Sequence, residues 1–130
     1  MFFVSITRLR LRSPLYLLGF LRYAIPSSQQ SIKAPGNLVT QTRCQGLTVF
    51  WTLTVWQDEA SMRRYMVSGS HRQAMPKLAQ WCDEASTVHW LQDSAELPPW
   101  EDIQQRMVAN GRLCPVKHPS ANHAAGAISL

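Results

Sequence analysis

Residues 50–75, FWTLTVWQDEASMRRYMVSGSHRQAM, place a strand, a helix start, a break and a histidine in close succession. The strand extends over 47–56, where every odd position is apolar and the even positions mix threonines with aromatic rings. This pattern predicts a strand covered on both faces, by helices on one and by a half-polar cavity or a partner on the other.

The second half of the stretch predicts two helical segments. Asp58 is a natural N-cap for a helix that begins at 59, and Ser-Gly-Ser at 68–70 breaks or loosens it. The segment 71–82 has apolar residues at helical spacing, with His71 at its head. Pro76 lies too deep for a first turn and is expected to bend this helix.

The N-terminal third predicts a strand and a helix. Residues 2–12 alternate in period two, which indicates a strand, and Ser13-Pro14 is a typical helix start. The expected apolar stripe of that helix consists of Leu15, Leu18, Leu21, Arg22 and Ile25. Pro26 is expected to kink or end the helix, and the Ala-Pro-Gly turn at 34–36 leads into a strand over 37–44.

The C-terminal part adds a strand over 86–92, a short helix over 98–110 and, after Cys114, a loose tail. The order of elements is then βαββαβ, which predicts the α+β ferredoxin-like plan, a four-stranded antiparallel sheet with two helices on one face. Residues 1–95 are expected to form this domain, and 96–130 an extra helix and tail. Because the strands look buried on both sides, two sheets packed face to face in a homodimer would account for the second face.

Composition narrows the functional classes. The chain has 130 residues, enough for one domain, with 45% hydrophobic and 16% charged residues and a net charge of +5. The basic residues are dispersed, so no nucleic-acid tail is expected. Three cysteines without a close pair favour a reducing compartment, and the longest N-terminal apolar piece is too short for a membrane span. We therefore expect a cytoplasmic protein.

A family resemblance emerges over residues 33–90. The carrying features are the Pro35-Gly36 turn, the WTLTVW strand, Asp58-Glu59 at the helix start, the Gly-Ser-His around His71, and Trp81. Together they resemble the dimeric α+β barrel superfamily, in its spheroidene-monooxygenase-like and antibiotic-biosynthesis-monooxygenase-like branches. The resemblance implies a homodimer with pockets for apolar polyene or polycyclic molecules, and oxygenation either without a cofactor or with haem.

His71 is the main candidate for catalysis and for cofactor binding. A neutral imidazole can ligate haem iron, and a histidine with an ordinary pKa can accept a proton from a phenolic substrate. The alternative is a histidine near a helix N-terminus that bonds only to local backbone. Pro76 departs from the family pattern. Because it lies five residues after His71 and interrupts the same helix, it would change the position from which His71 could ligate iron.

The other candidates would form the wall of an apolar substrate site. One face of the 47–56 strand gives Phe50, Thr52, Thr54 and Trp56, and the remaining candidates are Tyr65, Met75 and His89. A packed dimer interface would use the same strand residues without a ligand, and a structural role for His89 is the simpler interpretation. Trp51 points to the opposite face and is expected in the core.

Two further groups have a simple and a functional interpretation. Arg8, Arg10 and Arg12 could bind ligand carboxylates such as haem propionates, although a solvated strand face is commoner. The methionines Met62, Met66 and Met75 fit core filling better than a haem neighbourhood.

The leading hypothesis is therefore a monooxygenase-like oxidoreductase, cofactor-free or haem-assisted, acting on an apolar small molecule. The alternative is a non-catalytic ligand-binding or assembly module on the same fold. Single-stranded RNA binding also occurs on βαββαβ folds, but the 47–56 strand lacks the basic and glycine residues of that motif.

Overall fold

The computed structural model describes residues 1–128 and residue 130. Its elements, in chain order, are β1 (Phe2–Leu11), the 3-10 helix η1 (Pro14–Tyr16), α1 (Leu17–Lys33), β2 (Asn37–Gln45), β3 (Val49–Trp56), α2 (Glu59–Met66), α3 (Gly69–Trp81), β4 (Cys82–Gln92), α4 (Trp100–Asn110), β5 (Arg112–Leu113) and α5 (Ala121–Ala124).

The strands form one antiparallel sheet in the order β2-β3-β1-β4-β5. The first four strands have the predicted ferredoxin-like arrangement, so the predicted α+β class and the βαββαβ core are confirmed. The two residues of β5 add a fifth strand at the β4 edge, where Ser86 and Thr87 pair with Leu113 and Arg112.

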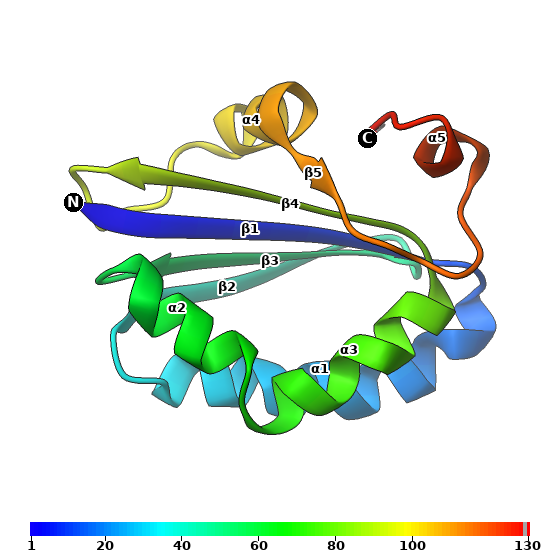
Figure 1. Cartoon of the computed structure of the whole chain (residues 1–130), viewed down its shortest axis with the longest axis horizontal. Helices are drawn as coiled ribbons and strands as arrows, with labels where there is room; N and C mark the ends of the chain where they lie inside the picture. Colours follow the sequence, from blue (N-terminus) through cyan, green and yellow to red (C-terminus); the bar gives the residue numbers. More distant parts are fainter. Residues whose placement is uncertain (129) are drawn as a thin grey trace.

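The molecule has three layers, with the sheet in the middle (Figure 1). Helices α1, α2 and α3 cover one face, here called the helix face, and α4 and α5 lie on the other, the α4 face. Side chains of each strand alternate between the two faces. In β1, Phe3 and Leu11 pack on the helix face, whereas Val4 and Ile6 pack on the α4 face.

The α4 face contains the largest apolar cluster. Buried side chains from three strands meet Ile103 and Met107 of α4; the strand members are Val4, Ile6, Trp51, Leu53, Val55 and Val88. Trp51 packs edge-on against Trp100 with ring centroids 4.7 Å apart, so its predicted place in the core is confirmed. The sequence predicts a partner sheet on this face. The chain's own α4 packs on part of this face, and the pairing of two sheets stays a prediction.

The start of β4 differs from the prediction. The strand begins at Cys82 rather than Ser86, because β1 and β4 are joined by ion pairs that place charged residues inside a strand. Arg8 contacts Glu84 at 2.9 Å with both side chains nearly inaccessible, and Arg10 contacts Asp83 at 2.9 Å. Arg8 is therefore buried, and the predicted solvated face is wrong for it.

Helix α1 turns a different side to the sheet than its spacing predicts. Its buried residues are Phe20, Ser27 and Ser31, whereas Leu18 of the predicted stripe is 82% exposed. Helix α1 is 17 residues long and is not ended by Pro26, and α3 likewise continues through Pro76. A proline removes one backbone donor, and the packing of the helix tolerates that loss in both cases.

The segment predicted to be a loose tail is attached to β4 by backbone hydrogen bonds. Cys114 N–H donates to Ala85 and Ser120 N–H donates to Asp83, both at backbone oxygens, at 2.8 and 2.9 Å. The Ser120 hydroxyl also donates to Glu84 at 2.7 Å. These bonds hold the segment after β5 against β4, so it is not a loose tail. Helix α4 likewise packs into the core of the sheet.

Candidate active site

The helix face carries a patch of hydroxyl groups in the middle of the sheet. The strand register places Thr42, Thr52, Thr7 and Thr87 side by side in one row across four strands, and Thr40, Thr54, Ser5 and His89 in the next. We call the seven hydroxyl residues of these rows the hydroxyl floor. Apolar clusters border it on both sides, one around Trp56 and the other around Phe20.

Parts of the hydroxyl floor remain only half-buried although they lie on central strands. Thr7 of β1 and Thr52 of β3 are both in this class. The helices above turn small side chains inward, among them Ser27 and Ser31 of α1 and Ala74 of α3, which are buried. Small residues therefore face a polar floor in this layer, whereas tryptophans and methionine meet on the α4 face.

Tyr65, at the end of α2, is the centre of an aromatic and polar cluster in this layer. Its ring lies 5.4 Å from the Trp56 ring and 4.9 Å from the His71 ring, centroid to centroid. Its hydroxyl donates to the Ser27 backbone oxygen at 3.0 Å. Burial raises the pKa of Tyr65 to about 12, so the phenol stays protonated at neutral pH. We call Ser27, Gln30, Trp56, Tyr65 and His71 the Tyr65 cluster.

His71 lies in the first turn of α3 and makes hydrogen bonds through both its backbone N–H and its ring. Its backbone N–H donates to Gln30 Oε1 at 3.2 Å, and Gln30 Nε2 donates to the Ser68 backbone oxygen at 3.0 Å. The glutamine of α1 thus caps α3. Gly69 begins this turn at φ +54°, a left-handed conformation that glycine adopts without strain.

The contact of the His71 ring fixes its tautomer. Nδ1 lies 3.1 Å from the Met66 backbone oxygen, and a carbonyl can only accept, so Nδ1 carries the hydrogen. Nε2 then keeps its lone pair. Burial lowers the pKa of His71 below its ordinary value, outweighing the Met66 contact, so the ring is neutral at neutral pH. A neutral ring with a free lone pair has the state that a general base needs.

Two buried donors in this layer have no hydrogen-bond partner within the described part of the chain. They are the indole N–H of Trp56 and the hydroxyl of Ser27. Both residues touch Tyr65, through its ring and its hydroxyl respectively. An unsatisfied buried donor costs about 1–3 kcal/mol, so a bound acceptor would relieve it.

The structure brings some of the predicted site residues together and separates others. Trp56, Tyr65 and His71 are neighbours, and Thr52 and Thr54 belong to the hydroxyl floor. Phe50 packs instead on Phe20 at 4.5 Å, in the opposite cluster.

The remaining two predicted site residues lie outside the Tyr65 cluster. Met75 is 45% exposed, on the outer side of α3. His89 is exposed near Phe3, with ring centroids 5.3 Å apart. Burial of part of its ring lowers its pKa.

The predicted position of the strand wall also changes. Phe50, Thr52, Thr54 and Trp56 lie on the face under helices α1–α3, so this face cannot be the seam between two sheets, and their role as a pocket wall stays a prediction. Sequence reasoning missed Ser27 and Gln30. The sequence feature that could have identified them is a row of small or polar residues at helical spacing on α1, on the side opposite the leucines that were predicted to be buried.

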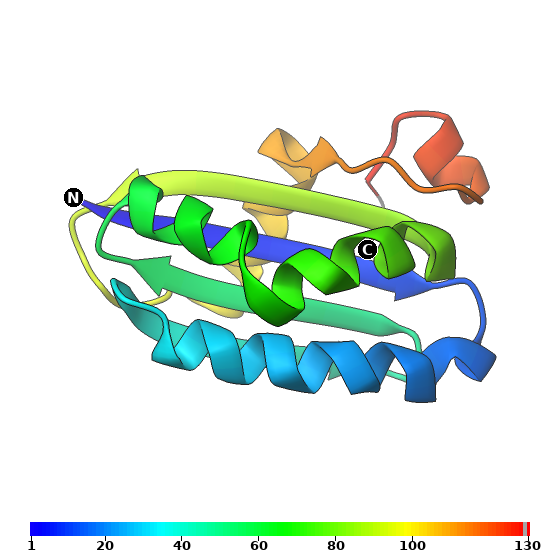
Figure 2. The same ribbon diagram turned by 60° about the horizontal axis from the view of Figure 1, so that its bottom comes forward.

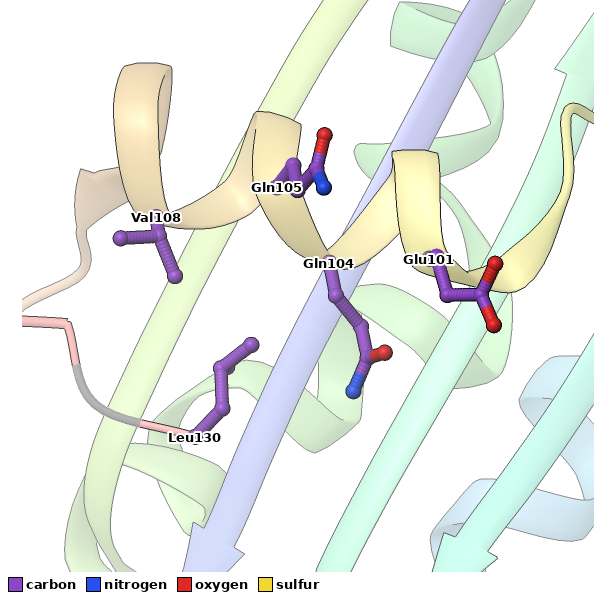
Figure 3. A pocket seen from close by; sticks show the side chains of 5 residues that line it. All are labelled: Glu101, Gln104, Gln105, Val108 and Leu130. Atoms are coloured by element: carbon purple, nitrogen blue, oxygen red, sulfur yellow. The ribbon is translucent and has the colours of Figure 1, made fainter.

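Two shallow hollows lie on the surface. One, of about 430 Å³, opens beside Tyr65 between the end of α1 and α2. The other residues that line it are Gln30, Lys33, Ala34, Pro35, Ser61, Arg64 and Ser68. The other, of about 410 Å³, is an open depression on the outer side of α4, lined by Glu101, Gln104, Gln105, Val108 and Leu130 (Figure 3). Only the first adjoins the Tyr65 cluster.

Among the residues that the structure describes, no group of three or more histidine, cysteine, aspartate or glutamate side chains is placed to hold a metal ion. Within the same residues, no helix is both long and apolar enough to cross a bilayer.

The fold is shared with several solved structures. A conserved protein from Methanosarcina mazei Go1 superposes with a TM-score of 0.64 at 14% identity, covering 72% of this chain and 94% of that one. SnoaB, a cofactor-independent oxygenase from Streptomyces nogalater, gives 0.59 at 13% identity, covering 75% and 98%. A proposed antibiotic biosynthesis monooxygenase from Nitrosomonas europaea gives 0.64 at 16% identity, covering 71% and 90%.

These likenesses confirm the resemblance to antibiotic-biosynthesis-monooxygenase-like proteins at the level of the fold. No curated protein matches the sequence. The family described as "Domain of unknown function (DUF3291)" matches residues 25–112, from the middle of α1 to the start of β5. Since that span is more than half of the sequence and includes every member of the Tyr65 cluster, the chain belongs to the DUF3291 family.

Proposed function

We propose that this protein is a monooxygenase-like oxidoreductase that oxygenates an apolar, phenolic polycyclic molecule held between the sheet and helices α1–α3. The observation that carries the proposal is the Tyr65 cluster. It combines a neutral histidine of fixed tautomer with two buried donors that lack a protein partner. The hollow beside Tyr65 is the proposed entrance.

His71 acts as the base in this proposal. Its Nε2 takes a proton from the activated methylene of the substrate, which leaves a delocalised anion that is rich enough in electrons to reduce O2. The methylene and O2 become a carbonyl and water, so all four electrons come from the substrate and no further reductant is needed. The unpartnered donors of Trp56 and Ser27 stabilise the oxyanion that develops.

Haem does not fit the residues predicted for it. A haem would need an axial histidine and cations for its two propionates. His71 offers a free nitrogen, but Arg8 and Arg10 lie on the α4 face and bind Glu84 and Asp83. The third predicted arginine, Arg12, donates to the Gln80 backbone oxygen and the Tyr16 hydroxyl. Hemin titration is expected to give no shift of the Soret band, and no step is assigned to this group.

The test follows oxygen consumption with 1,8-dihydroxy-9-anthrone, a phenolic polycycle with an activated methylene. The wild-type protein is expected to exceed the spontaneous rate. His71→Ala should lower the enzymatic rate by about 10²–10⁴-fold, the usual contribution of a general base. Trp56→Phe keeps an aromatic side chain, smaller than indole, but removes the N–H, and should lower the enzymatic rate by about 10²-fold.

His118→Ala is the matched control, since His118 is exposed on the C-terminal segment. Its rate should equal that of the wild type. If the wild type binds the anthrone, seen by quenching of tryptophan fluorescence, but never exceeds the spontaneous rate, the alternative of a non-catalytic binding module replaces the oxygenase. Equal rates in wild type and His71→Ala would remove His71 from the chemistry.

A further inference from the structure

The hollow beside Tyr65 has two cations and no acidic residue on its lining. Lys33, in the last turn of α1, and Arg64 of α2 carry the charge, and the other residues that line the hollow are neutral. Neither cation belongs to an ion pair within the described part of the chain. Arg63, the neighbour of Arg64 in the sequence, instead binds Glu59 at 2.6 Å. Lys33 and Arg64 are therefore available to a ligand.

The walls of the hollow are joined by hydrogen bonds, so its shape exists before a ligand arrives. Gln30 Nε2 donates to the backbone oxygen and to the hydroxyl of Ser68, at 3.0 and 2.9 Å, which ties α1 to the start of α3. The Gln57 N–H donates to the Gly36 backbone oxygen at 2.7 Å. Gly36 has φ +87°, and a Cβ there would overlap the Ser61 side chain, so the turn after α1 packs directly on α2. Figure 2 shows the end of α1 and helix α2 at the same end of the molecule.

The Arg64 guanidinium is oriented by the N-terminal cap of its own helix. Arg64 Nη2 donates to the Ser61 hydroxyl at 3.1 Å, and that hydroxyl donates to Asp58 Oδ1 at 2.7 Å. A guanidinium has five N–H donors, arranged as a fork that matches the two oxygens of a carboxylate. The contact with Ser61 uses one of them, so donors remain for a ligand.

The charge around the hollow suits a singly charged anion. Hydrogen bonds from Ser61, and to a smaller extent the Arg64 charge, hold the pKa of Asp58 below its ordinary value, so Asp58 is ionised at neutral pH. Two cations beside one carboxylate leave a net charge of +1 at this place. One ligand carboxylate neutralises that charge, whereas a phosphate dianion would exceed it.

The hollow is continuous with the Tyr65 cluster, because Gln30 and Tyr65 belong to both. A planar ligand with its reacting carbon near His71 would extend past the Tyr65 ring, which lies 4.9 Å from the His71 ring, toward the hollow. A substituent on the outer edge of such a ligand would then lie between Lys33 and Arg64. Ala34 and Pro35, also on the lining, offer apolar contact to the ring that carries the substituent.

We propose that the hollow beside Tyr65 is a carboxylate subsite, in which Arg64 and Lys33 bind an acid group on the edge of the polycyclic ligand. The substrate class is then a phenolic polycyclic carboxylic acid. Arg64 pairs with both oxygens of the acid through its fork, and Lys33 adds a point charge. This inference rests on the proposed function for the polycyclic body of the ligand and adds the acid group to it.

Binding of a product analogue tests the subsite without turnover. The two probes are 1,8-dihydroxyanthraquinone-3-carboxylic acid and its primary amide, which have nearly the same shape and differ in charge. Quenching of tryptophan fluorescence at neutral pH gives their dissociation constants. The wild type should bind the acid about 10-fold more tightly than the amide, because charge-assisted hydrogen bonds to the acid replace neutral ones.

Substitution of each cation separates its charge from the rest of the hollow. Lys33→Gln and Arg64→Gln should each weaken binding of the acid by about 3–10-fold and change binding of the amide by less than about 2-fold. Arg63→Gln is the matched control, since Arg63 is exposed on the same helix but binds Glu59 and does not line the hollow. Its affinity for the acid should equal that of the wild type.

Equal affinity of the wild type for acid and amide would overturn the inference, as would a loss in Arg63→Gln as large as that in Arg64→Gln. Displacement of the acid by inorganic phosphate at concentrations where acetate has no effect would also overturn it, in favour of a phosphate group. A preserved preference for the acid, without catalysed oxygen consumption by the corresponding anthrone, would remove the proposed oxygenase and leave the carboxylate subsite in place. Binding of neither probe would overturn both.

Discussion

Replacement of Glu84 by glutamine should destabilise this protein strongly, because the change leaves the Arg8 charge buried without its partner. The two side chains are 6% and 8% exposed and their closest atoms are 2.9 Å apart. Glutamine has almost the shape of glutamate, so the variant removes the charge and little else. Breaking a buried ion pair in this way costs about 3–5 kcal/mol.

The expected shift in melting temperature follows from the size of the chain. For 130 residues, the entropy of unfolding is about 0.27 kcal/mol per degree. A loss of about 3–5 kcal/mol therefore lowers the melting temperature by about 11–18 °C. Arg8 Nε has no partner within the described residues even in the wild type, so the arginine has no second acceptor to compensate.

Urea titration followed by tryptophan fluorescence measures this loss at equilibrium. Glu96→Gln, at an exposed position, is the control and should change the free energy of unfolding by less than about 0.5 kcal/mol. The double variant Arg8→Met with Glu84→Gln should recover much of the stability, because the unpaired charge is then gone.

The pH dependence has a definite sign. Burial by itself raises the pKa of Glu84, but the hydrogen bonds from Arg8 and Ser120 and the nearby arginine charges outweigh it, so the folded pKa lies below the ordinary value. The unfolded chain therefore binds the proton first as the pH falls. The stabilisation is complete above the ordinary pKa of about 4.5 and is lost as the pH falls from there through the folded pKa. A melting-temperature shift under 2 °C in Glu84→Gln would refute the buried-pair reasoning.

Three further outcomes are expected. Ile103→Ala should lower the free energy of unfolding by about 2–5 kcal/mol in guanidinium titration, since Ile103 is 1% exposed in the cluster under α4; a loss within 0.5 kcal/mol, as expected for exposed Val108→Ala, would mean that α4 is not part of the core. Under native conditions Ellman's reagent should label Cys44 quickly and Cys82 only on unfolding, because Cys44 is exposed while burial raises the pKa of Cys82 to about 12; fast labelling that persists in Cys44→Ser would contradict this. Because burial depresses the pKa of His71, stability should fall as the pH drops below about 6.5 toward the folded pKa, and His71→Phe should flatten this part of the stability curve.

The sequence by itself determined the elements whose signals are local. The alternation in 2–12 and 47–56 predicted two strands, which the structure places at Phe2–Leu11 and Val49–Trp56. Ser13 and Asp58 marked helix starts that the structure confirms with side-chain caps. The βαββαβ order followed from these elements. An apolar pattern with a period of two or 3.6 residues depends only on residues close in the sequence, so it can be recognised without knowledge of the rest of the fold.

Only the tertiary structure decided which face of each element meets which layer. In β3 both faces carry large apolar residues, so the sequence had no means to tell that Trp51 faces α4 and Trp56 faces Tyr65. The same ambiguity hid Ser27 and Gln30, which the sequence offers as ordinary polar helix residues. It also changed the buried side of α1: Leu21 of the predicted stripe packs in the core, whereas Leu18 and Ile25 face outward. Which side of a helix or strand becomes buried depends on contacts with segments that are distant in the sequence, and a local pattern does not contain these contacts.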